Sequence, residues 1–403
     1  MFNRFGERMG QAAGLRFNAF KDESDNAGPL AQVLALNPYK KRGNLMKTKK
    51  IWMGLSMALM LVAAGCGNNN AAVKNDPGTG NAPAAATEAP ASGAGSGDAK
   101  SYKIAISQYV EHPSLDATRE GFLAALKDGG IVEGENLKVD LQNAQADQAN
   151  NLSIAQKIAG DKNDLVLGIA TPSAQAVVQN VKDTPILFAA VTDPLDAKIV
   201  SDLEHPGGNV SGVSDTNPES ITRLMNFIAT QFPKVKKLGL VINEGEPNAV
   251  VMADIAKGEL DKHGIELVKA AITNTSEVKQ AAESLVGRVD ALYITLDNSV
   301  VSGVDAIIQT ANDNKLPFFS ADRDTVEKGA FATVGFKYYD HGYQVGQMAV
   351  EVLKNGKSPG DMKVTMQEKL DLVLNLKAAA AQGIEVTDAM KAEVADPGNN
   401  IIQ

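Results

Sequence analysis

The decapeptide NDLVLGIATP (163–172) returns later in the chain, in altered form, as VDALYITLDN (289–298). Each copy is a short apolar run that ends in small and polar residues, which is typical of a buried strand followed by a loop. A second pair follows in the same order, DTPILFAAVTD (183–193) and KLPFFSADRD (315–324). The repeated order predicts two similar α/β units in series.

The segments around these strands extend the pattern in both directions. We expect strands at 102–108, 137–143, 164–170, 185–191 and 236–243, and helices at 117–130, 149–160 and 172–181. Strands that alternate with amphipathic helices favour parallel sheets covered on both faces. The folded part begins at about residue 101 and is roughly 300 residues long, so a single core would be too large and we expect two lobes.

Polar residues collect where the predicted strands end, in the loops TPSAQ (171–175), VTDP (191–194), TLDNS (295–299) and SADRD (320–324). In open parallel sheets, ligands bind beyond the carboxyl ends of the strands. Two such units that face each other would therefore enclose a ligand between these four loops.

Two of these loops suggest opposite charges on the ligand. Thr171, Ser173 and Ala174 begin a helix whose free N–H groups suit a carboxylate, or they serve only as an ordinary helix cap. Asp297 can bind an ammonium group or cap the next helix, and we favour the ammonium because the matching loop of the other unit suits an anion. We expect Asp193 to be a cap. A helix start that faces Asp297 would hold a zwitterion.

The first hundred residues carry an export pattern. Met46 opens a segment with a basic head, an apolar core (51–62) and small residues before Cys66, which is the layout of a secretory signal peptide. Ala-Ala-Gly-Cys resembles a bacterial lipoprotein box, so we expect lipidation of Cys66; a free cysteine after an ordinary cleavage site is the alternative. Residues 1–45 would then be an upstream extension, 46–65 the signal peptide, and 66–100 the lipidated cysteine and a flexible tether.

Six blocks carry a further resemblance, namely EHPSLDATREGF, ATPSAQ, VTDPLDAKIVSDLEHPGGNVSGVSD, NEGEPNA, TLDNSV and KGAFATVGFKYYDHG. From about residue 101 to 390 the chain resembles the substrate-binding lipoproteins of ATP-binding-cassette (ABC) importers, in the tryptophan/tyrosine-binding group. The resemblance implies the type I periplasmic-binding-protein fold, in which three crossing segments join two lobes around a cleft. The crossings would fall near Thr216, Ala330 and Gly360, which gives a first lobe of 101–216 plus 331–360 and a second of 217–330 plus 361–403.

The matching loops supply the expected ligand-binding residues: Tyr109, His112, Leu115, Asp116, Thr171, Ser173, Ala174, Thr192, Asp193, Ser214, Asp215, Glu246, Asn248, Asp297, Asn298, Ser299 and Asp322. Tyr109 would offer its ring to the ligand, although an aromatic beside an apolar run is more often core. His112 and Asp116 could also form a metal pair, but the four histidines are dispersed and we expect neither metal nor cofactor. Glu244 and Ala249 stand where the family often has proline and serine, which leaves the exact ligand open.

The loops and the resemblance together imply a non-catalytic receptor for a small zwitterion, an aromatic amino acid such as tryptophan or tyrosine. We expect an exported monomer, held by lipid alone on the outer face of a bacterial membrane, that delivers its ligand to the permease of an ABC importer. A sugar or nucleoside receptor is the main alternative, although the chain has no tryptophan after Cys66 on which a sugar ring could stack.

Other function classes find less support in the residues. The motifs of nucleophile elbows, zinc proteases, phosphate-binding loops and dinucleotide sites are absent from the sequence, which argues against a lipid-anchored enzyme. The net charge of -9 argues against a nucleic-acid partner.

Overall fold

The computed structural model describes residues 100–403. The predictions for the upstream extension (1–45), the signal peptide (46–65), the lipidated Cys66 and the tether up to residue 99 lie outside the described residues.

The first lobe is built on a parallel sheet. Its strands are β1 (Tyr102–Gln108), β2 (Leu137–Asn143), β3 (Leu165–Ile169), β4 (Ile186–Val191), β5 (Val210–Ser214) and β11 (Thr365–Met366), in the order β11-β5-β4-β3-β1-β2. Its helices are α1 (Pro113–Asp128), α2 (Gln148–Gly160), α3 (Thr171–Asn180) and α10 (Tyr338–Asn355), with the 3-10 turn η2 (Pro359–Asp361).

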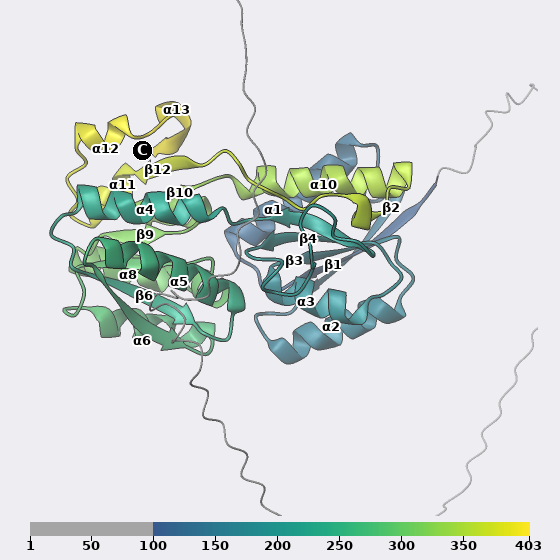
Figure 1. Ribbon diagram of the computed structural model, residues 1–403, viewed down its shortest axis with the longest axis horizontal. Coiled ribbons are helices and arrows are strands. Elements are labelled where there is room, and N and C mark those ends of the chain that lie inside the picture. Colours follow the sequence, from purple (N-terminus) through teal and green to yellow (C-terminus); the bar gives the residue numbers. More distant parts are fainter. Residues whose placement is uncertain (1–99) are drawn as a thin grey trace, which may run out of the picture. The chain divides into compact units, whose positions relative to one another are not determined.

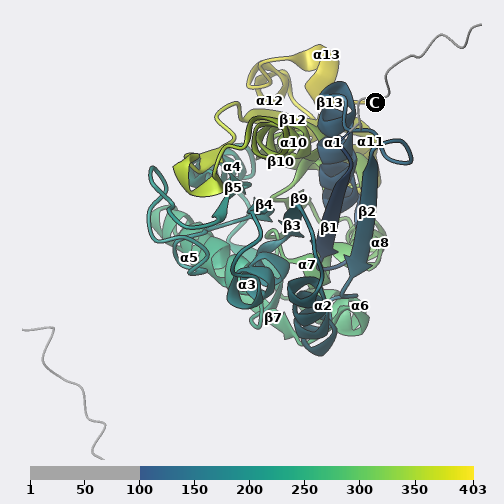
Figure 2. The same ribbon diagram turned by 90° about the vertical axis from the view of Figure 1, so that its right-hand side faces the viewer.

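Helices cover both faces of this sheet. Figure 2 shows α1 and α10 on one face and α2 and α3 on the other. Strand β3 explains the arrangement, because Leu165, Leu167 and Ile169 join the core under α1 and α10, whereas Val166 joins the core under α2 and α3. A strand that is buried on both faces reads as the continuous apolar run seen in the sequence.

The second lobe is also a sheet covered by helices, and its sheet has one more strand than that of the first lobe (Figure 1). Its strands are β6 (Lys237–Asn243), β7 (Glu266–Ile272), β8 (Ala291–Ile294), β9 (Phe318–Ser320), β10 (Ala332–Gly335), β12 (Asp371–Asn375) and β13 (Ile401–Ile402), in the order β13-β12-β10-β9-β8-β6-β7. Its helices are α4 (Pro218–Gln231), α5 (Pro247–Lys262), η1 (Thr275–Glu277), α6 (Val278–Leu285), α7 (Asn298–Ser302), α8 (Val304–Asn314), α9 (Arg323–Lys328), α11 (Leu376–Ala381), α12 (Asp388–Ala392) and α13 (Pro397–Asn400). The sheet is parallel except where β12 runs antiparallel to β10.

The chain crosses between the two sheets at residues 215–217, 336–337 and 367–370. The first crossing contains Thr216, where it was expected. The other two correct the expected positions near Ala330 and Gly360. Strand β10 still pairs with β9 and β12 of the second sheet, and β11 still pairs with β5 of the first, so each crossing comes several residues later.

Helix α1 also begins earlier than expected, at Pro113 rather than near residue 117. His112 is extended, with φ -161° and ψ 162°, and forms the N-cap position without a side-chain capping bond. Pro113 then takes the first helical position, where its fixed φ is favourable and its missing N–H costs nothing. Ser114 and Leu115 are therefore placed in the first turn.

Helices α1 and α10 meet backbone to backbone, although they lie more than 200 residues apart in the sequence (Figure 1). A Cβ added at Gly342 would overlap the carbonyl group of Thr118, and one added at Gly121 would overlap that of Tyr339. The glycines thus permit a close contact that fixes the start of α1 relative to the start of α10.

Candidate ligand-binding site

A small cavity lies between the two lobes, where β4, β5 and β8 end. Its water-accessible volume is about 20 Å³, which is room for about one water molecule. The first lobe lines it with His112, Ser114, Leu115, Ala190, Thr192, Asp215 and Tyr338, and the second lobe lines it with Asn248, Leu296, Asn298, Val301 and Asp322.

Larger grooves open on the surface, among them one of about 590 Å³ near Tyr102 and one of about 600 Å³ near Phe232. Their lining residues include the starts of β1 and β2 and residues just before β6, β8 and β9. Because ligands of parallel α/β sheets bind at the carboxyl ends of the strands, the smaller interlobe cavity is the better candidate.

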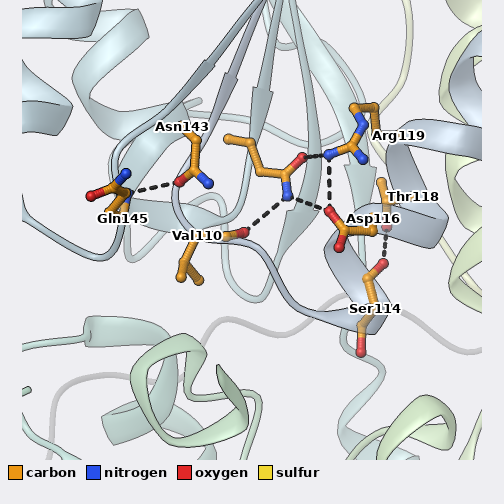
Figure 3. Close-up of polar contacts among 8 residues, drawn as sticks. Val110, Ser114, Asp116, Thr118, Arg119, Asn143 and Gln145 are labelled. Carbon is orange, nitrogen blue, oxygen red and sulfur yellow. Dashed lines mark hydrogen bonds and ion pairs between the residues drawn. The ribbon is translucent and has the colours of Figure 1, made fainter. Parts of the chain in front are cut away.

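Two hydrogen bonds join the lobes at the cavity. The Ser114 hydroxyl donates to Asp322 Oδ1 over 3.2 Å, and His112 Nε2 lies 3.4 Å from Asn298 Oδ1. Both contacts bring the start of α1 against the second lobe. In Figure 3 the Ser114 hydroxyl points away from Asp116, although both residues belong to the first turn of this helix.

His112 presents an unpaired ring nitrogen at the cavity. The Asn298 side-chain NH₂ donates to Glu246, so its oxygen faces His112 and accepts from the Nε2–H. Burial lowers the pKa of His112, which favours the neutral ring despite the opposing field of Asp322. Nδ1 is then a bare acceptor, and it makes no hydrogen bond within residues 100–403.

Asp215 is the carboxylate that the first lobe turns toward the cavity. Its oxygens accept from the hydroxyls of Thr216 at 3.1 Å and Tyr338 at 3.0 Å. Burial raises the pKa of Asp215 to about 6, and these hydroxyl donors offset part of that rise. A carboxylate has about four lone-pair positions, so Asp215 retains capacity for further donors.

Asp322 is the carboxylate that the second lobe contributes. Besides Ser114, it accepts from Thr325 N at 2.7 Å, from Thr325 Oγ1 at 2.8 Å and from Ser320 Oγ at 3.3 Å, and it caps helix α9. Its acceptor positions are therefore filled, and the Ser114 bond is the one that crosses between lobes.

The cavity is rich in acceptors and poor in positive charge. Asn248 Oδ1, like His112 Nδ1, is buried without a hydrogen bond in the described part of the chain. The lining residues include the carboxyl groups of Asp215 and Asp322 but no lysine or arginine. Such a site suits a ligand that brings several donors, among them a cationic one.

The structure corrects the expected role of Asp297. Its two oxygens accept from the backbone N–H groups of Asn243 and Val300, it caps helix α7, and it does not line the cavity. Burial, with the nearby charge of Glu246 as a second cause, raises its pKa well above the ordinary value. The sequence pattern of a strand followed by aspartate predicted a ligand contact, whereas the geometry is that of a buried cap.

Glu246 and Ser299 are likewise engaged within the second lobe. Glu246 accepts from the backbone N–H and the side chain of both Asn298 and Ser299, at 2.6 to 3.0 Å. The fully buried carboxylate thus stabilises the start of helix α7 and holds Asn298 in place. Neither Glu246 nor Ser299 lines the cavity.

The residues expected to bind an anion at the start of α3 likewise lie inside their own lobe and not at the cavity. Thr171 Oγ1 accepts from Thr192 N at 3.4 Å, and Ser173 Oγ donates to Asn151 at 3.0 Å. Both residues and Ala174 are buried in the first lobe and none lines the cavity. Other helix starts do reach the cavity, namely that of α1 through Ser114 and Leu115, and those of α5, α7 and α10 through Asn248, Asn298 and Tyr338.

Four further predicted residues have contacts elsewhere in the first lobe. Asp116 Oδ1 accepts from Arg119 Nη1 at 2.9 Å, as Figure 3 shows, and from Gln108 Nε2 at 2.9 Å. Tyr109 is core, and its hydroxyl donates to the carbonyl of Ala146. Asp193 accepts from the backbone N–H groups of residues 195 and 196 in a turn, and it is not the predicted helix cap because no helix begins between β4 and β5. Ser214 donates to the carbonyl of Thr192.

Of the predicted residues, the structure brings together seven at the cavity: His112, Leu115, Thr192, Asp215, Asn248, Asn298 and Asp322. Five further residues line it: Ser114, Ala190, Leu296, Val301 and Tyr338. The sequence offers Tyr338 as a further aromatic candidate, in the block KGAFATVGFKYYDHG, whereas sequence reasoning missed the other four. The proline at the first helical position could have revealed Ser114.

Within residues 100–403, no cluster of three or more His, Cys, Asp or Glu side chains could hold a metal ion. None of the helices described there combines the length and apolar character that crossing a bilayer requires.

Residues 103–396 match a family model described as ABC transporter substrate binding protein. A tyrosine-binding protein of Clostridioides difficile is 44% identical over 279 residues, which cover 69% of this chain and 80% of the relative.

Two solved structures support the assignment. An ABC domain in complex with L-Trp from Streptococcus pneumonia is 32% identical with a TM-score of 0.70, and covers 75% of this chain and 100% of its own. The ligand-free, open structure of a substrate-binding protein with adhesive properties from Clostridium difficile is 42% identical, with a TM-score of 0.55, and covers 75% of this chain and 98% of its own. The chain therefore belongs to the family of ABC transporter substrate-binding proteins.

Proposed function

We propose that this protein is a receptor that binds tyrosine or tryptophan between its lobes and delivers it to an ABC importer. The observation that carries the proposal is the interlobe cavity, which holds two carboxyl groups and unpaired acceptors but no lysine or arginine. The relative named for tyrosine and the structure in complex with L-Trp support an aromatic amino acid as the ligand.

The ligand ammonium would pair with Asp215, which has free acceptor capacity. Its positive charge would favour the ionised carboxylate and so lower the raised pKa of this group. His112 Nδ1 and Asn248 Oδ1 would accept further donors, including the phenol O–H of tyrosine or the indole N–H of tryptophan.

The ligand carboxylate would bind at the start of α1. The first-turn N–H groups of Ser114 and Leu115 are not capped by the side chain of His112, and the helix dipole favours an anion there. In the present arrangement Asp322 reaches this helix start across the cleft. A ligand carboxylate would take over that interaction from Asp322.

Binding would require the lobes to separate first. Pockets for small ligands usually enclose about 300–1,000 Å³, far more than this cavity. The bonds Ser114–Asp322 and His112–Asn298 would break on opening, and a ligand in contact with both lobes would stabilise the closed state that the permease recognises. The chain superposes better on the L-Trp complex, with a TM-score of 0.70, than on the open structure, with a TM-score of 0.55, although the open one is more similar in sequence.

A thermal-shift screen tests the ligand class. L-Tyrosine and L-tryptophan should raise the melting temperature, because a ligand at about a hundred times its Kd adds about 2.7 kcal/mol of stability. Tyramine and tryptamine, which lack the carboxylate, should raise it much less. Stabilisation by a sugar or a nucleoside, with no response to any amino acid, would contradict the proposal.

The anchor is part of the same proposal. Lipidation of Cys66 after removal of residues 46–65 would place the receptor on the outer membrane face, and the segment up to residue 99 would tether it there. Cys66→Ser should move the protein from the membrane to the soluble fraction without altering its melting temperature. Mass spectrometry of the mature N-terminus provides the check, since an unlipidated Cys66 in the wild type would refute this part.

A further inference from the structure

The end of strand β4 has an unusual backbone. Ala190 has φ 54°, in the left-handed region that residues with a Cβ rarely adopt. The pairing of β4 with β5 shifts register between Phe188 and Val191, so the Ala190 N–H leaves the ladder. Ala190 and the nearby Thr192 both line the interlobe cavity. The deviation therefore shapes a wall of the candidate site.

His341 accepts the hydrogen bond that the Ala190 N–H does not make within the sheet. The Ala190 N–H donates to His341 Nε2 over 2.9 Å, and both groups are buried. Nε2 must therefore be the bare nitrogen of a neutral ring whose proton is on Nδ1. Burial lowers the pKa of His341 to about 3, so the ring remains neutral over the physiological range.

The surroundings of His341 connect this wall to two crossings between the lobes. The His341 ring stacks on the ring of Phe336, which lies in the second crossing, with 5.6 Å between the ring centroids. It meets the Tyr338 ring edge-on, with 5.9 Å between the centroids. The Tyr338 hydroxyl in turn donates to Asp215 in the first crossing. One buried side chain thus contacts the backbone of the cavity wall and the aromatic pair beside the hinge.

We propose that His341 is a positioning residue of the binding site, whose Nε2 holds the Ala190 N–H and so fixes the backbone from Ala190 to Thr192 in the shape that meets the ligand. An apolar residue of similar size would fill the space but would leave a buried N–H without an acceptor. The backbone would then be free to return toward an ordinary strand. The effect on affinity rests on the proposed function.

Calorimetric titration with L-tyrosine compares three variants. His341→Leu should weaken binding by about tenfold or more, since the loss of one buried hydrogen bond is of that order. His341→Gln, whose side-chain oxygen can accept the same N–H, should recover much of the affinity. Val345→Ala, also buried on α10 but away from the cavity, is the control: it should lower the melting temperature and leave Kd within about twofold.

A merely structural role would give a different pattern. His341→Leu would then lower the melting temperature as Val345→Ala does, with Kd unchanged, and the proposal would be overturned. It would also be overturned if His341→Gln bound as weakly as His341→Leu while an amide hydrogen-exchange measurement found the Ala190 N–H protected in the Gln variant.

Hydrogen exchange and NMR test the contact without any ligand. The amide of Ala190 should exchange faster in His341→Leu than in the wild type, and Val345→Ala should not accelerate it. The imidazole ¹⁵N spectrum should show Nε2 unprotonated from about pH 5 to about pH 8. A protonated Nε2 would refute the contact. If no amino acid bound the wild type, the proposed function would be wrong. The hydrogen-exchange and ¹⁵N measurements would still show whether His341 holds the Ala190 N–H, because neither needs a ligand.

Discussion

Two aspartates occupy similar places in the two lobes and have different surroundings. Asp215 follows β5 in the first lobe and Asp297 follows β8, by three residues, in the second, and both are almost fully buried. Backbone N–H groups hold Asp297, whereas the side-chain hydroxyls of Thr216 and Tyr338 hold Asp215. Of the two, only Asp215 lines the cavity.

The difference lies in the donors rather than in burial, which raises the pKa of both carboxyl groups. Backbone N–H groups are fixed by the fold, so Asp297 cannot exchange them for a ligand without loss of the start of α7. Hydroxyl groups rotate and can also accept, so Asp215 can take a new donor while its neighbours reorient. The end of β5 is thus suited to binding and the end of β8 to structure.

The largest effect should therefore come from Asp215→Asn. This change keeps the shape but removes the charge that would pair with the ligand ammonium, so the affinity for L-tyrosine should fall by about 2 to 5 kcal/mol. Calorimetric titration measures the loss. Below about pH 6 the ligand-free variant should melt close to the wild type, because Asp215 then carries a proton and is neutral as asparagine is.

Two matched variants show whether contact or net charge is responsible. Asp297→Asn and Asp193→Asn make the same substitution at residues that do not line the cavity, and both should bind almost as the wild type does. If either weakened binding as much as Asp215→Asn, the distinction between the two strand ends would be lost.

The fold was largely predictable from the sequence because its signals are local. Apolar runs such as those in 163–172 and 289–298 indicate strands that are buried on both faces, and the repetition of these runs indicates two lobes. The later crossings were misplaced because strand β10 and strand β11 are short, and each is fixed by pairing with a distant strand rather than by its own pattern.

The site was predictable only in part, because a strand-end loop is visible in the sequence while the direction of its side chains is not. Asp322 was found in this way, whereas His112 and Asp215 came from the blocks that carry the family resemblance. Whether Asp297 caps a helix or meets a ligand depends on the backbone N–H of Asn243, which is 54 residues away. The contact of Ala190 with His341 joins residues 151 apart and has no local signal.

Asp297→Ala tests the structural half of the comparison. It removes the cap of α7 and leaves the Asn243 N–H without an acceptor, so the free energy of unfolding should fall by about 1 to 3 kcal/mol. Urea denaturation measures the change. Asp297→Asn should be milder, because asparagine also caps helices and the repulsion with Glu246 is removed. A fully stable alanine variant would show that the cap is dispensable.

The choice of ligand tests the remaining acceptors of the cavity. L-Phenylalanine has no side-chain donor, so it would leave one acceptor, such as His112 Nδ1 or Asn248 Oδ1, buried and unpaired. It should bind more weakly than L-tyrosine by about 1 to 3 kcal/mol. Competition titrations measure this difference. Equal affinities would mean that the unpaired acceptors do not face the aromatic side chain and that Asp215 alone supplies recognition.

The smallest expected effect is a dependence of the ligand affinity on pH. It should arise from the carboxyl group of Asp215 and not from that of Asp297. Below a pKa of about 6, the carboxyl group of ligand-free Asp215 carries a proton that must leave before the ammonium can pair with it. Affinity should therefore rise with pH and level off above about 6, with a loss of about 1.4 kcal/mol at about one pH unit below that value. Titrations at a series of pH values measure it, and Asp215→Asn should abolish it.

Folding stability should show the opposite sign in the same window. The pKa of Asp215 is raised in the folded state above the unfolded value of about 3.9, so its contribution to stability is present below about pH 4 and is lost as pH rises through about 6. Asp324 needs its own control, because burial raises its pKa to about 7 although it does not line the cavity. Asp324→Asn should alter the stability profile and leave the affinity profile unchanged. If Asp324→Asn abolished the pH dependence of affinity, the titrating group would be Asp324, which lies outside the cavity. The functional contrast between Asp215 and Asp297 would then be lost.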